Sequence, residues 1–396
     1  MTTTRHEITA ADISQGIDAS IDGMGIRRLA TFADYTNLDV DSHTIEKDIH
    51  RPKQDGDFYR FRYSMPTRAC HIPHFQLRNL LWATSKNDVY YGGWNRVYKW
   101  NPVARSDRLV FPTLNGHLTN DPVFNITITT MCCKENLMFV GGNEGEYFWR
   151  SLDTDTSATD HAKEEDEEAE GHKGYGFMNL PGNGITNYVD ISRQRSGSIA
   201  ALIANNDRCV RILDIANEVI TATFPLSWDP NCVAQSPDKN LMCIVGDNTD
   251  ALVVNLKSAI AKLPGHIDYS FACAWHPNGR VIATGNQDKT TRLYDTRKLS
   301  ESFTTLSGQI GSIRSLRFSD DGAFLAMAES ADFVHLVETR TWDRSQEIDL
   351  FSEIAGIAFT PGDSHNLYIA CSDIAIGAII NYERAWSTLD AMEWLP

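Results

Sequence analysis

The sequence predicts an all-β fold, a single seven-bladed β-propeller of four-stranded antiparallel blades with an N-terminal arm. A tight-turn pattern recurs at Ser236, His276, Ser319 and Thr360, in steps of 40, 43 and 41 residues. A repeat of about 40–45 residues with four short strands is typical of a propeller blade. The predicted third strands of seven such repeats end at Trp100, Trp149, Leu213, Val254, Tyr294, Val337 and Ile380.

Residues 265–297 show one repeat most completely. Apolar side chains alternate along residues 270–275, which predicts a half-buried strand. A His-Pro-Asn-Gly turn follows, and its proline and Asn-Gly pair suit the backbone angles of a tight turn. Two further apolar runs, at residues 281–285 and 290–295, complete a meander of antiparallel strands. One blade can therefore be traced strand by strand.

The N-terminal region is predicted in two parts. Residues 1–56 have little periodicity and are expected to form a poorly ordered arm. Residues 57–64 alternate as a strand. Because an open edge strand invites aggregation, we expect this strand to close the ring by completing the last blade, whose other strands come from residues 353–382. The propeller is therefore predicted to span residues 57–384.

The C-terminal tail, residues 385–396, has two interpretations. It packs Trp386 and Trp394 on the ring, or it is a detachable docking peptide.

An acidic insertion interrupts the second repeat. Residues 153–172 contain nine Asp or Glu and one Lys, and we expect a disordered loop over residues 153–175, because a block of like charge cannot bury enough apolar surface. The loop either only aids solubility or attracts a basic partner such as a histone or ribosomal protein.

Charge and composition exclude several classes of protein. The formal net charge is −16 and no Lys/Arg cluster occurs, so direct nucleic-acid binding is not expected. No apolar run is long enough to span a bilayer, and the N-terminus does not resemble a secretory signal, so no membrane contact is expected. The eight cysteines show no C-x-x-C spacing and fit reduced thiols. These features favour a cytoplasmic or nuclear location.

The Gly-His at residues 265–266 and the aromatic-Asp pair at residues 294–295 resemble the WD-repeat (WD40) family. The resemblance implies a hydrogen-bonded ladder inside the blade, formed here by His266, Thr284, Asp288 and Tyr294, with Tyr in place of the family's Trp. The other repeats keep less of this pattern. Residues 74–93 also resemble the first blade of functionally uncharacterised fungal WD-repeat proteins, which implies a fungal origin.

The resemblance implies a non-enzymatic scaffold or adaptor that binds other proteins, because this family mostly builds docking platforms. Positions that such proteins commonly use for binding fall on the rim loops. Trp94, which replaces the corner Asp of the first blade, is either an exposed aromatic anchor or packed on the arm. The rim-loop candidates are Trp94, Asn206, Tyr269, Gln287 and Ser312.

Two other classes of function stay open. Arg297 and Arg340 follow an acidic residue by two places in consecutive repeats, which resembles the W-D-x-R element of substrate receptors of cullin-type ubiquitin ligases. We expect instead that each Arg is buried against a carboxylate of its own chain. The second alternative is an enzyme that acts on a small molecule in the central channel, but the innermost strands are expected to offer mostly Ile, Ala, Phe and Cys.

No catalytic residue, metal ligand or cofactor is expected. The sequence has no G-x-S-x-G, P-loop or H-E-x-x-H motif. Cys70, His71 and His74 have metal-ligand chemistry, but they lack a second Cys/His pair to complete a four-ligand zinc shell.

Overall fold

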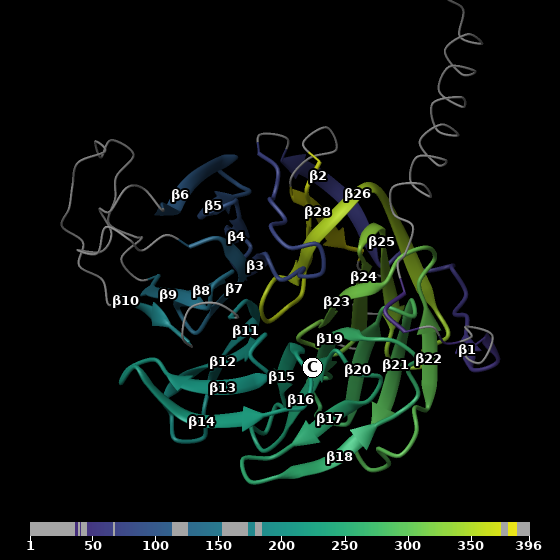
Figure 1. Cartoon of the computed structure of the whole chain (residues 1–396). Coiled ribbons are helices and arrows are strands. Elements are labelled where there is room, and N and C mark those ends of the chain that lie inside the picture. The colour runs from purple at the N-terminus through teal and green to yellow at the C-terminus, as the bar shows by residue number, and fades with distance from the viewer. Residues whose placement is uncertain are drawn as a thin grey trace, which may run out of the picture. The chain divides into compact units, whose positions relative to one another are not determined.

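The computed structural model describes residues 36–38, 40, 46–65, 68–112, 126–152, 173–178, 184–373 and 379–385 (Figure 1). Every named element in these ranges is a β-strand, from β1 to β28. None of the described residues belongs to a helix long and apolar enough to cross a membrane. Three predictions lie outside the described residues: the order of residues 1–35, the acidic insertion at 153–172, and the packing of Trp386 and Trp394.

Four blades are separate antiparallel sheets of four strands, each following the chain order. Blade 1 contains β3 (Leu81–Ser85), β4 (Asp88–Gly92), β5 (Arg96–Asn101) and β6 (Ser106–Pro112). Blade 2 contains β7 (Ile128–Lys134), β8 (Leu137–Gly142), β9 (Glu146–Ser151) and β10 (Lys173–Phe177). Blade 3 contains β11 (Thr186–Arg193), β12 (Ile199–Asn205), β13 (Cys209–Asp214) and β14 (Val219–Pro225). Blade 4 contains β15 (Pro230–Gln235), β16 (Met242–Gly246), β17 (Ala251–Val254) and β18 (Ala259–Leu263).

The other three blades share strands or gain one. Blade 5 contains β19 (Ser270–Trp275), β20 (Val281–Asn286), β21 (Thr290–Asp295) and β22 (Thr304–Ser307). Blade 6 contains β23 (Ile313–Phe318), β24 (Phe324–Glu329), β25 (Ala331–Glu338) and the first part of β26 (Ser345–Phe359). Blade 7 contains the rest of β26, β27 (Asn366–Cys371), β28 (Ile379–Arg384) and β2 (Tyr59–Met65). Because β26 pairs first with β25 and then with β27, two blades are joined in one seven-stranded sheet.

The innermost strands close the ring. Each of β3, β7, β11, β15, β19, β23 and β26 contacts the next, and β26 returns to contact β3. Figure 1 shows the blades following one another in chain order around this ring. The strand predicted at residues 57–64 is observed as β2, and it pairs antiparallel with β28, as the closure argument requires. The seven-bladed all-β fold is confirmed.

Part of the predicted arm lies on the propeller. The short strand β1 (Ile49–His50) pairs in parallel with β22 and adds a fifth strand to blade 5. Lys53 then bonds to the outer strand of blade 6, where its carbonyl accepts from Ser345 N at 2.8 Å. Residues 46–56 therefore cover the outer edges of two neighbouring blades, and the predicted boundary at residue 56 is too late for them.

The core lies between the blades. The first strand of blade 5, β19, was expected to be half-buried, but all six of its residues are buried. One apolar cluster joins Leu293 of blade 5 to Leu316 and Val337 of blade 6. The expectation was wrong because a blade in a closed ring is covered on both faces by its neighbours, so both faces of an inner strand exclude water.

Candidate functional site

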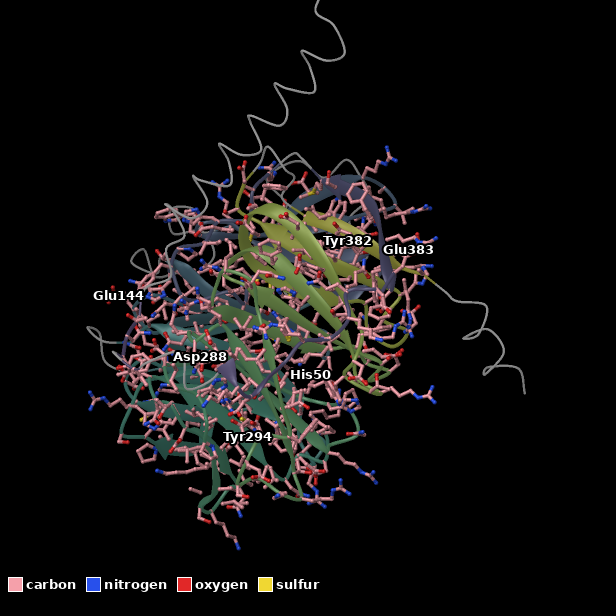
Figure 2. The ribbon with its side chains drawn as sticks, turned by 90° about the vertical axis from the view of Figure 1, so that its right-hand side faces the viewer. His50, Glu144, Asp288, Tyr294, Tyr382 and Glu383 are labelled. Carbon is pink, nitrogen blue, oxygen red and sulfur yellow. The ribbon has the colours of Figure 1, made fainter. Side chains whose placement is uncertain are left out.

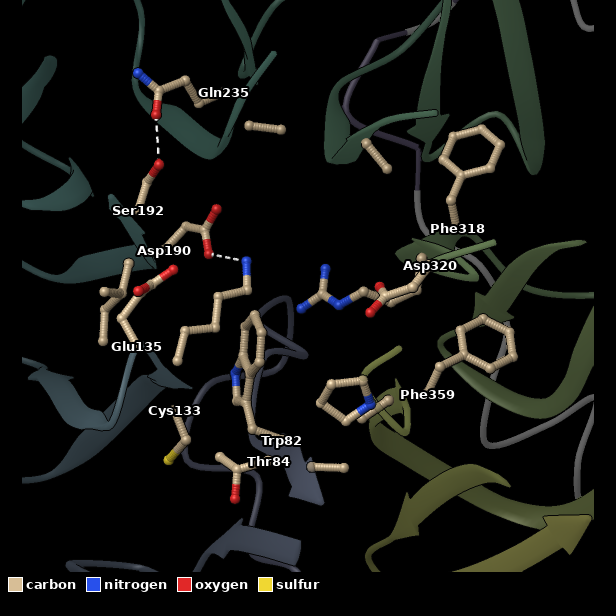
Figure 3. A pocket seen from close by; sticks show the side chains of 18 of the residues that line it. Trp82, Thr84, Cys133, Glu135, Asp190, Ser192, Gln235, Phe318, Asp320 and Phe359 are labelled. Atoms are coloured by element: carbon tan, nitrogen blue, oxygen red, sulfur yellow. Dashed lines mark hydrogen bonds and ion pairs between the residues drawn. The ribbon is translucent and has the colours of Figure 1, made fainter. Parts of the chain in front are cut away.

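A cavity of about 820 Å³ occupies one end of the central channel (Figure 3). Most of its lining comes from the innermost strands of all seven blades and from the turns that follow them, including Pro237, Pro277 and Pro361. Asp88 and Tyr90 of β4 and Lys99 of β5 add to it from blade 1. These turns form the rim that we call the turn rim. The connections that enter the innermost strands, and the corners between the second and third strands, form the opposite rim, which we call the loop rim, because neighbouring strands are antiparallel.

Arg317 closes the floor of this cavity. The residue starts from β23 of blade 6, and its Nη2 donates to Asn79 Oδ1 at 2.8 Å, next to blade 1. Its Nη1 donates to the Tyr188 hydroxyl of blade 3 at 3.1 Å and to the carbonyl of Leu316. Arg317 and Tyr188 also line the small space on the other side of the channel, so the guanidinium stands between the two.

Two cations lie over the indole ring of Trp82, a buried residue of β3. Arg317 Cζ is 4.8 Å and Lys134 Nζ is 4.9 Å from the ring centroid. The indole N–H donates to the carbonyl of Met131 at 2.5 Å, which fixes the ring against blade 2. Cation–π contacts of this kind strengthen where water is excluded, so Trp82 positions both charges at the cavity.

One carboxylate, Asp190 of β11, balances part of this charge. Lys134 Nζ lies 2.5 Å from Asp190 Oδ1 (Figure 3). Burial opposes the ammonium charge, but the Asp190 carboxylate outweighs it and raises the pKa of Lys134 above its ordinary value. Lys239, in the turn after β15, forms no ion pair within the described ranges, and burial lowers its pKa. Three cations, Lys134, Lys239 and Arg317, therefore lie in this part of the cavity with two carboxylates, Asp190 and Glu135.

The other side of the cavity is mostly apolar and carries one carboxylate, Asp320, which Figure 3 shows between Phe318 and Phe359. Trp275, Phe318 and Phe359 end the innermost strands of blades 5, 6 and 7, and all three line the cavity. Figure 3 shows Phe318 and Phe359 on the side away from Asp190 and Trp82. The Trp275 indole N–H donates to the carbonyl of Ala234 at 2.9 Å, so its polar atom is satisfied while its ring faces the cavity. The cavity thus has a charged side and an apolar side.

These channel residues correct the expectation that the innermost strands offer mostly Ile, Ala, Phe and Cys. Lys134, Asp190 and Arg317 lie near the ends of β7, β11 and β23, and sequence reasoning missed them as site residues. The signal was a charged residue inside an otherwise apolar first strand of a repeat. A charge there must either face the channel or be paired, because both faces of the strand are covered.

The predicted loop-rim residues do not form one surface. Trp94 is 59% exposed, and its ring lies 4.0 Å from that of His71, so it neither projects freely nor packs in the core. Asn206 and Tyr269 are half-buried, and Asn206 accepts from Asn187 at 3.1 Å. Gln287 is buried and accepts from Arg314 at 2.6 Å.

Ser312 is fully buried, and its carbonyl accepts from Ser330 N at 2.9 Å. Gln287 and Ser312 are therefore corrections, since buried side chains are not available to a partner. Their burial follows from the close contact between neighbouring innermost strands, which the sequence spacing does not report.

The structure brings the four ladder residues together in blade 5. His266 Nδ1 lies 2.9 Å from Asp288 Oδ2, and His266 Nε2 lies 2.9 Å from the Thr284 hydroxyl. Tyr294 donates its hydroxyl to the carbonyl of Pro264 at 2.9 Å. Figure 2 labels Asp288 and Tyr294 in this blade. Burial opposes ionisation of Asp288, but the nearby His266 imidazole and the hydrogen bonds outweigh it and hold the pKa of Asp288 below its ordinary value.

Blade 6 builds a different network at the matching place. The buried Glu329 carboxylate accepts the backbone N–H groups of Gln309 at 2.6 Å, Ile310 at 2.9 Å, and Gly311. His335 Nε2 lies 2.7 Å from the same carboxylate. A Cβ at position 311 would lie 3.3 Å from Glu329 Oε2, so glycine leaves room for this approach. Glu329 was not predicted. Asp332, three residues further along the chain, is also buried and has a φ of 71°.

Arg297 and Arg340 are both exposed, which contradicts the expectation that each is buried against its own chain. The Arg297 side chain is 74% exposed, and its Nε donates to Asp295 Oδ1 of the same turn at 2.9 Å. Both residues follow a third strand, β21 or β25, in neighbouring blades, so they lie on the turn-rim side. The expectation failed because the turn between the third and fourth strands lies outside the interblade core.

The residues with metal-ligand chemistry are spread apart. The described ranges contain no group of three or more His, Cys, Asp or Glu side chains placed to hold a metal ion. Cys70 is buried, with its thiol 3.0 Å from the carbonyl of Gly92, and burial raises its pKa to about 12. The ring of His71 lies against that of Trp94 at an angle of 34°, and His74 lies beside Phe75. All eight cysteines are free thiols.

Comparison with known proteins places this geometry in a family context. A model of the WD domain, G-beta repeat, matches residues 257–295, which run from β18 of blade 4 to β21 of blade 5. An uncharacterised protein of Schizosaccharomyces pombe is 23% identical over 326 residues, 77% of this chain and 84% of that protein. Pre-mRNA-processing factor 19 homolog 2 of Arabidopsis thaliana is 28% identical over 127 residues, 32% of this chain and 23% of that protein.

A solved structure shows the same fold. A chain in a crystal structure of the mitotic checkpoint complex matches with a TM-score of 0.61 and 16% identity, covering 89% of this chain and 98% of that chain. At this identity the likeness concerns the fold alone. The likeness agrees with the β-propeller fold of this chain, and the similarity to the WD domain, G-beta repeat, concerns residues 257–295.

Proposed function

We propose that this chain is a non-enzymatic scaffold or adaptor that binds other proteins through its channel mouth on the turn rim. The observation that carries the proposal is the cavity with a charged side and an apolar side, because specific protein recognition combines an apolar contact with a few placed charges. WD-repeat propellers generally bind other proteins. The names of the relatives do not identify a partner for this chain.

The charged groups of the cavity suit docking better than catalysis. Lys134 and Asp190 are paired with each other, and Arg317 is held by three hydrogen bonds to neutral groups. A channel enzyme would use a general base in reach of its nucleophile. We accordingly place the enzyme alternative last, and we propose neither a cofactor nor a metal.

A second candidate function is a substrate receptor of a cullin-type ubiquitin ligase. The exposure of both Arg297 and Arg340 favours it, because a docking patch needs both guanidinium groups in solvent. The Arg297–Asp295 pair weakens it, since the fork of that guanidinium is already engaged by its own blade.

The test is affinity purification of the tagged full chain from its native organism, with identification of partners by mass spectrometry. The scaffold proposal expects a reproducible partner set that is lost when the channel mouth is altered. The ligase alternative expects a cullin adaptor in that set, lost on the double change Arg297→Ala and Arg340→Ala. A chain that purifies alone under gentle, low-salt conditions would contradict both. A basic partner of the acidic insertion is a proposal that the same experiment tests. A fungal origin and a cytoplasmic or nuclear location also remain proposals.

A further inference from the structure

We propose that the channel mouth binds an extended segment of a partner protein that carries a carboxylate side chain beside a large apolar side chain. The inference rests on the proposed scaffold function and names the class of ligand for its site. It follows from three properties of the cavity: the unused donors on its floor, the apolar residues on the opposite wall, and the small excess of positive charge.

The floor offers donors for a carboxylate. A guanidinium has five N–H donors, and Arg317 uses three of them for Tyr188, Leu316 and Asn79. The other two have no hydrogen-bond partner among the described residues. Lys239 adds an ammonium without an ion pair in the same lining. A carboxylate that reaches the floor would meet a planar donor pair and a second cation, the arrangement that gives strong charge-assisted bonds.

The charge balance favours one carboxylate over a phosphate group. Asp190 stands 2.5 Å from Lys134, and Glu135, at the edge of the cavity, stands 2.7 Å from Arg193. Asp88, also in the lining, stands 2.6 Å from Lys99, so the cations left are Arg317 and Lys239, against the carboxylate of Asp320. This small excess of positive charge matches a ligand group of single negative charge. A phosphate of nearly two negative charges would lie close to Asp190 and be repelled by it.

The opposite wall accommodates an apolar side chain. Trp275, Phe318 and Phe359 line the cavity from three neighbouring blades, and Figure 3 shows Phe318 and Phe359 on one side of it. Burying one large apolar side chain there favours binding, because its apolar surface leaves water. The volume of about 820 Å³ lies in the range of enclosed ligand sites, and the cavity opens at the turn rim, so an extended segment can enter from that side.

The experiment is a selection of random linear peptides of about a dozen residues on the immobilised full chain, followed by calorimetry with the enriched peptides. We expect a consensus with Asp or Glu next to Phe, Leu, Trp or Tyr. Changing that acid to its amide should weaken binding by about tenfold, the loss typical of one charge-assisted bond. A phosphoserine version should bind more weakly than the acidic one.

Variants of the chain locate the site. Lys239→Gln should weaken binding about tenfold, whereas the matched control Lys257→Gln, an exposed lysine on the outer turn of the same blade, should not change it. Enriched peptides that bind wild type and Lys239→Gln equally would overturn this inference and keep the scaffold function. A consensus without an acidic residue, or a preference for phosphoserine, would overturn the ligand class. Enrichment of no peptide would overturn the inference, while partners found by affinity purification would still support a scaffold.

Discussion

The two rims of the propeller use polar residues in opposite ways. On the loop rim, the side chains of Glu329 and Asp288 are buried and bonded to backbone N–H groups of their own blades. On the turn rim, Lys134 and Lys239 line an open cavity. The comparison teaches that the loop-rim groups hold the blades in shape, while the turn-rim groups are available to a ligand. Substitutions on the first rim should change stability, and those on the second should change binding.

Within the loop rim, neighbouring blades use different residues to accept hydrogen bonds from the loop that enters the innermost strand. Blade 5 satisfies its entry loop with Asp288, which accepts from Ile267 N at 3.2 Å and stands against His266. Blade 6 satisfies the corresponding loop with Glu329, which accepts from three successive backbone N–H groups. The blade needs a buried acceptor at this place, because the loop N–H groups have no strand partner. The residue that supplies this acceptor differs between the two blades.

The largest effect is expected for Glu329→Ala. The change leaves three buried backbone donors and His335 without their acceptor, and should lower the free energy of unfolding by about 3–5 kcal/mol. Denaturant titration measures it, with Glu301→Ala, an exposed carboxylate of blade 5, as the control. If Glu329→Ala lowers the free energy of unfolding by less than Glu301→Ala does, the Glu329 carboxylate does not hold the loop.

Asp288→Ala should have the next largest effect, about 1–3 kcal/mol, because Asp288 accepts from two backbone N–H groups, those of Ile267 and Thr290, whereas Glu329 accepts from three. The pH dependence has a defined sign. Since the folded pKa of Asp288 lies below its unfolded value, its contribution is present above about pH 4 and is lost as the pH falls through the folded pKa. The stability difference between wild type and Asp288→Asn should therefore shrink on acidification. A difference that grows below pH 4 would contradict the ladder as described.

The double change Arg297→Ala and Arg340→Ala should be nearly neutral for stability, within about 0.5 kcal/mol, because both side chains are exposed. Thermal melting of the double variant beside wild type checks this. A fall of several degrees would mean that these residues hold their blades, as the sequence had suggested.

The smallest effect is expected for deletion of residues 153–172. The flanking strands β9 and β10 pair with each other directly, so the hairpin needs only a short connection. The melting temperature should stay nearly unchanged, since long surface loops cost little to shorten. A large fall would show that the insertion docks on the ring.

Sequence reasoning predicted the fold because the blade is a local unit. The turn at His276, the alternation along residues 270–275 and the spacing of the repeats depend on nearby residues only. The closing strand was also predictable, since a ring leaves one edge to be paired, and β2 pairs with β28. The shared strand β26 was not predictable, because its bend between two blades depends on contacts made by both halves.

The candidate site was mostly not predictable. Arg317 begins in blade 6 and bonds to residues of blades 1 and 3, and no local pattern reports a contact across the channel. Gln287 and Ser312 occupy loop positions by spacing, yet they are buried by the neighbouring blade. Spacing along the chain identifies which strand a residue belongs to, and the ring decides whether its side chain meets solvent, a neighbour or the channel.

The central claim, that the turn rim binds and the loop rim supports, is tested most directly by measuring stability and partner binding on the same two variants. Lys239→Gln should unfold like wild type, within about 0.5 kcal/mol, yet lose the co-purified partners. Asp288→Ala should lose about 1–3 kcal/mol, yet keep those partners at a temperature where it is folded. The reverse pattern, partners retained by Lys239→Gln and lost from folded Asp288→Ala, would contradict the account.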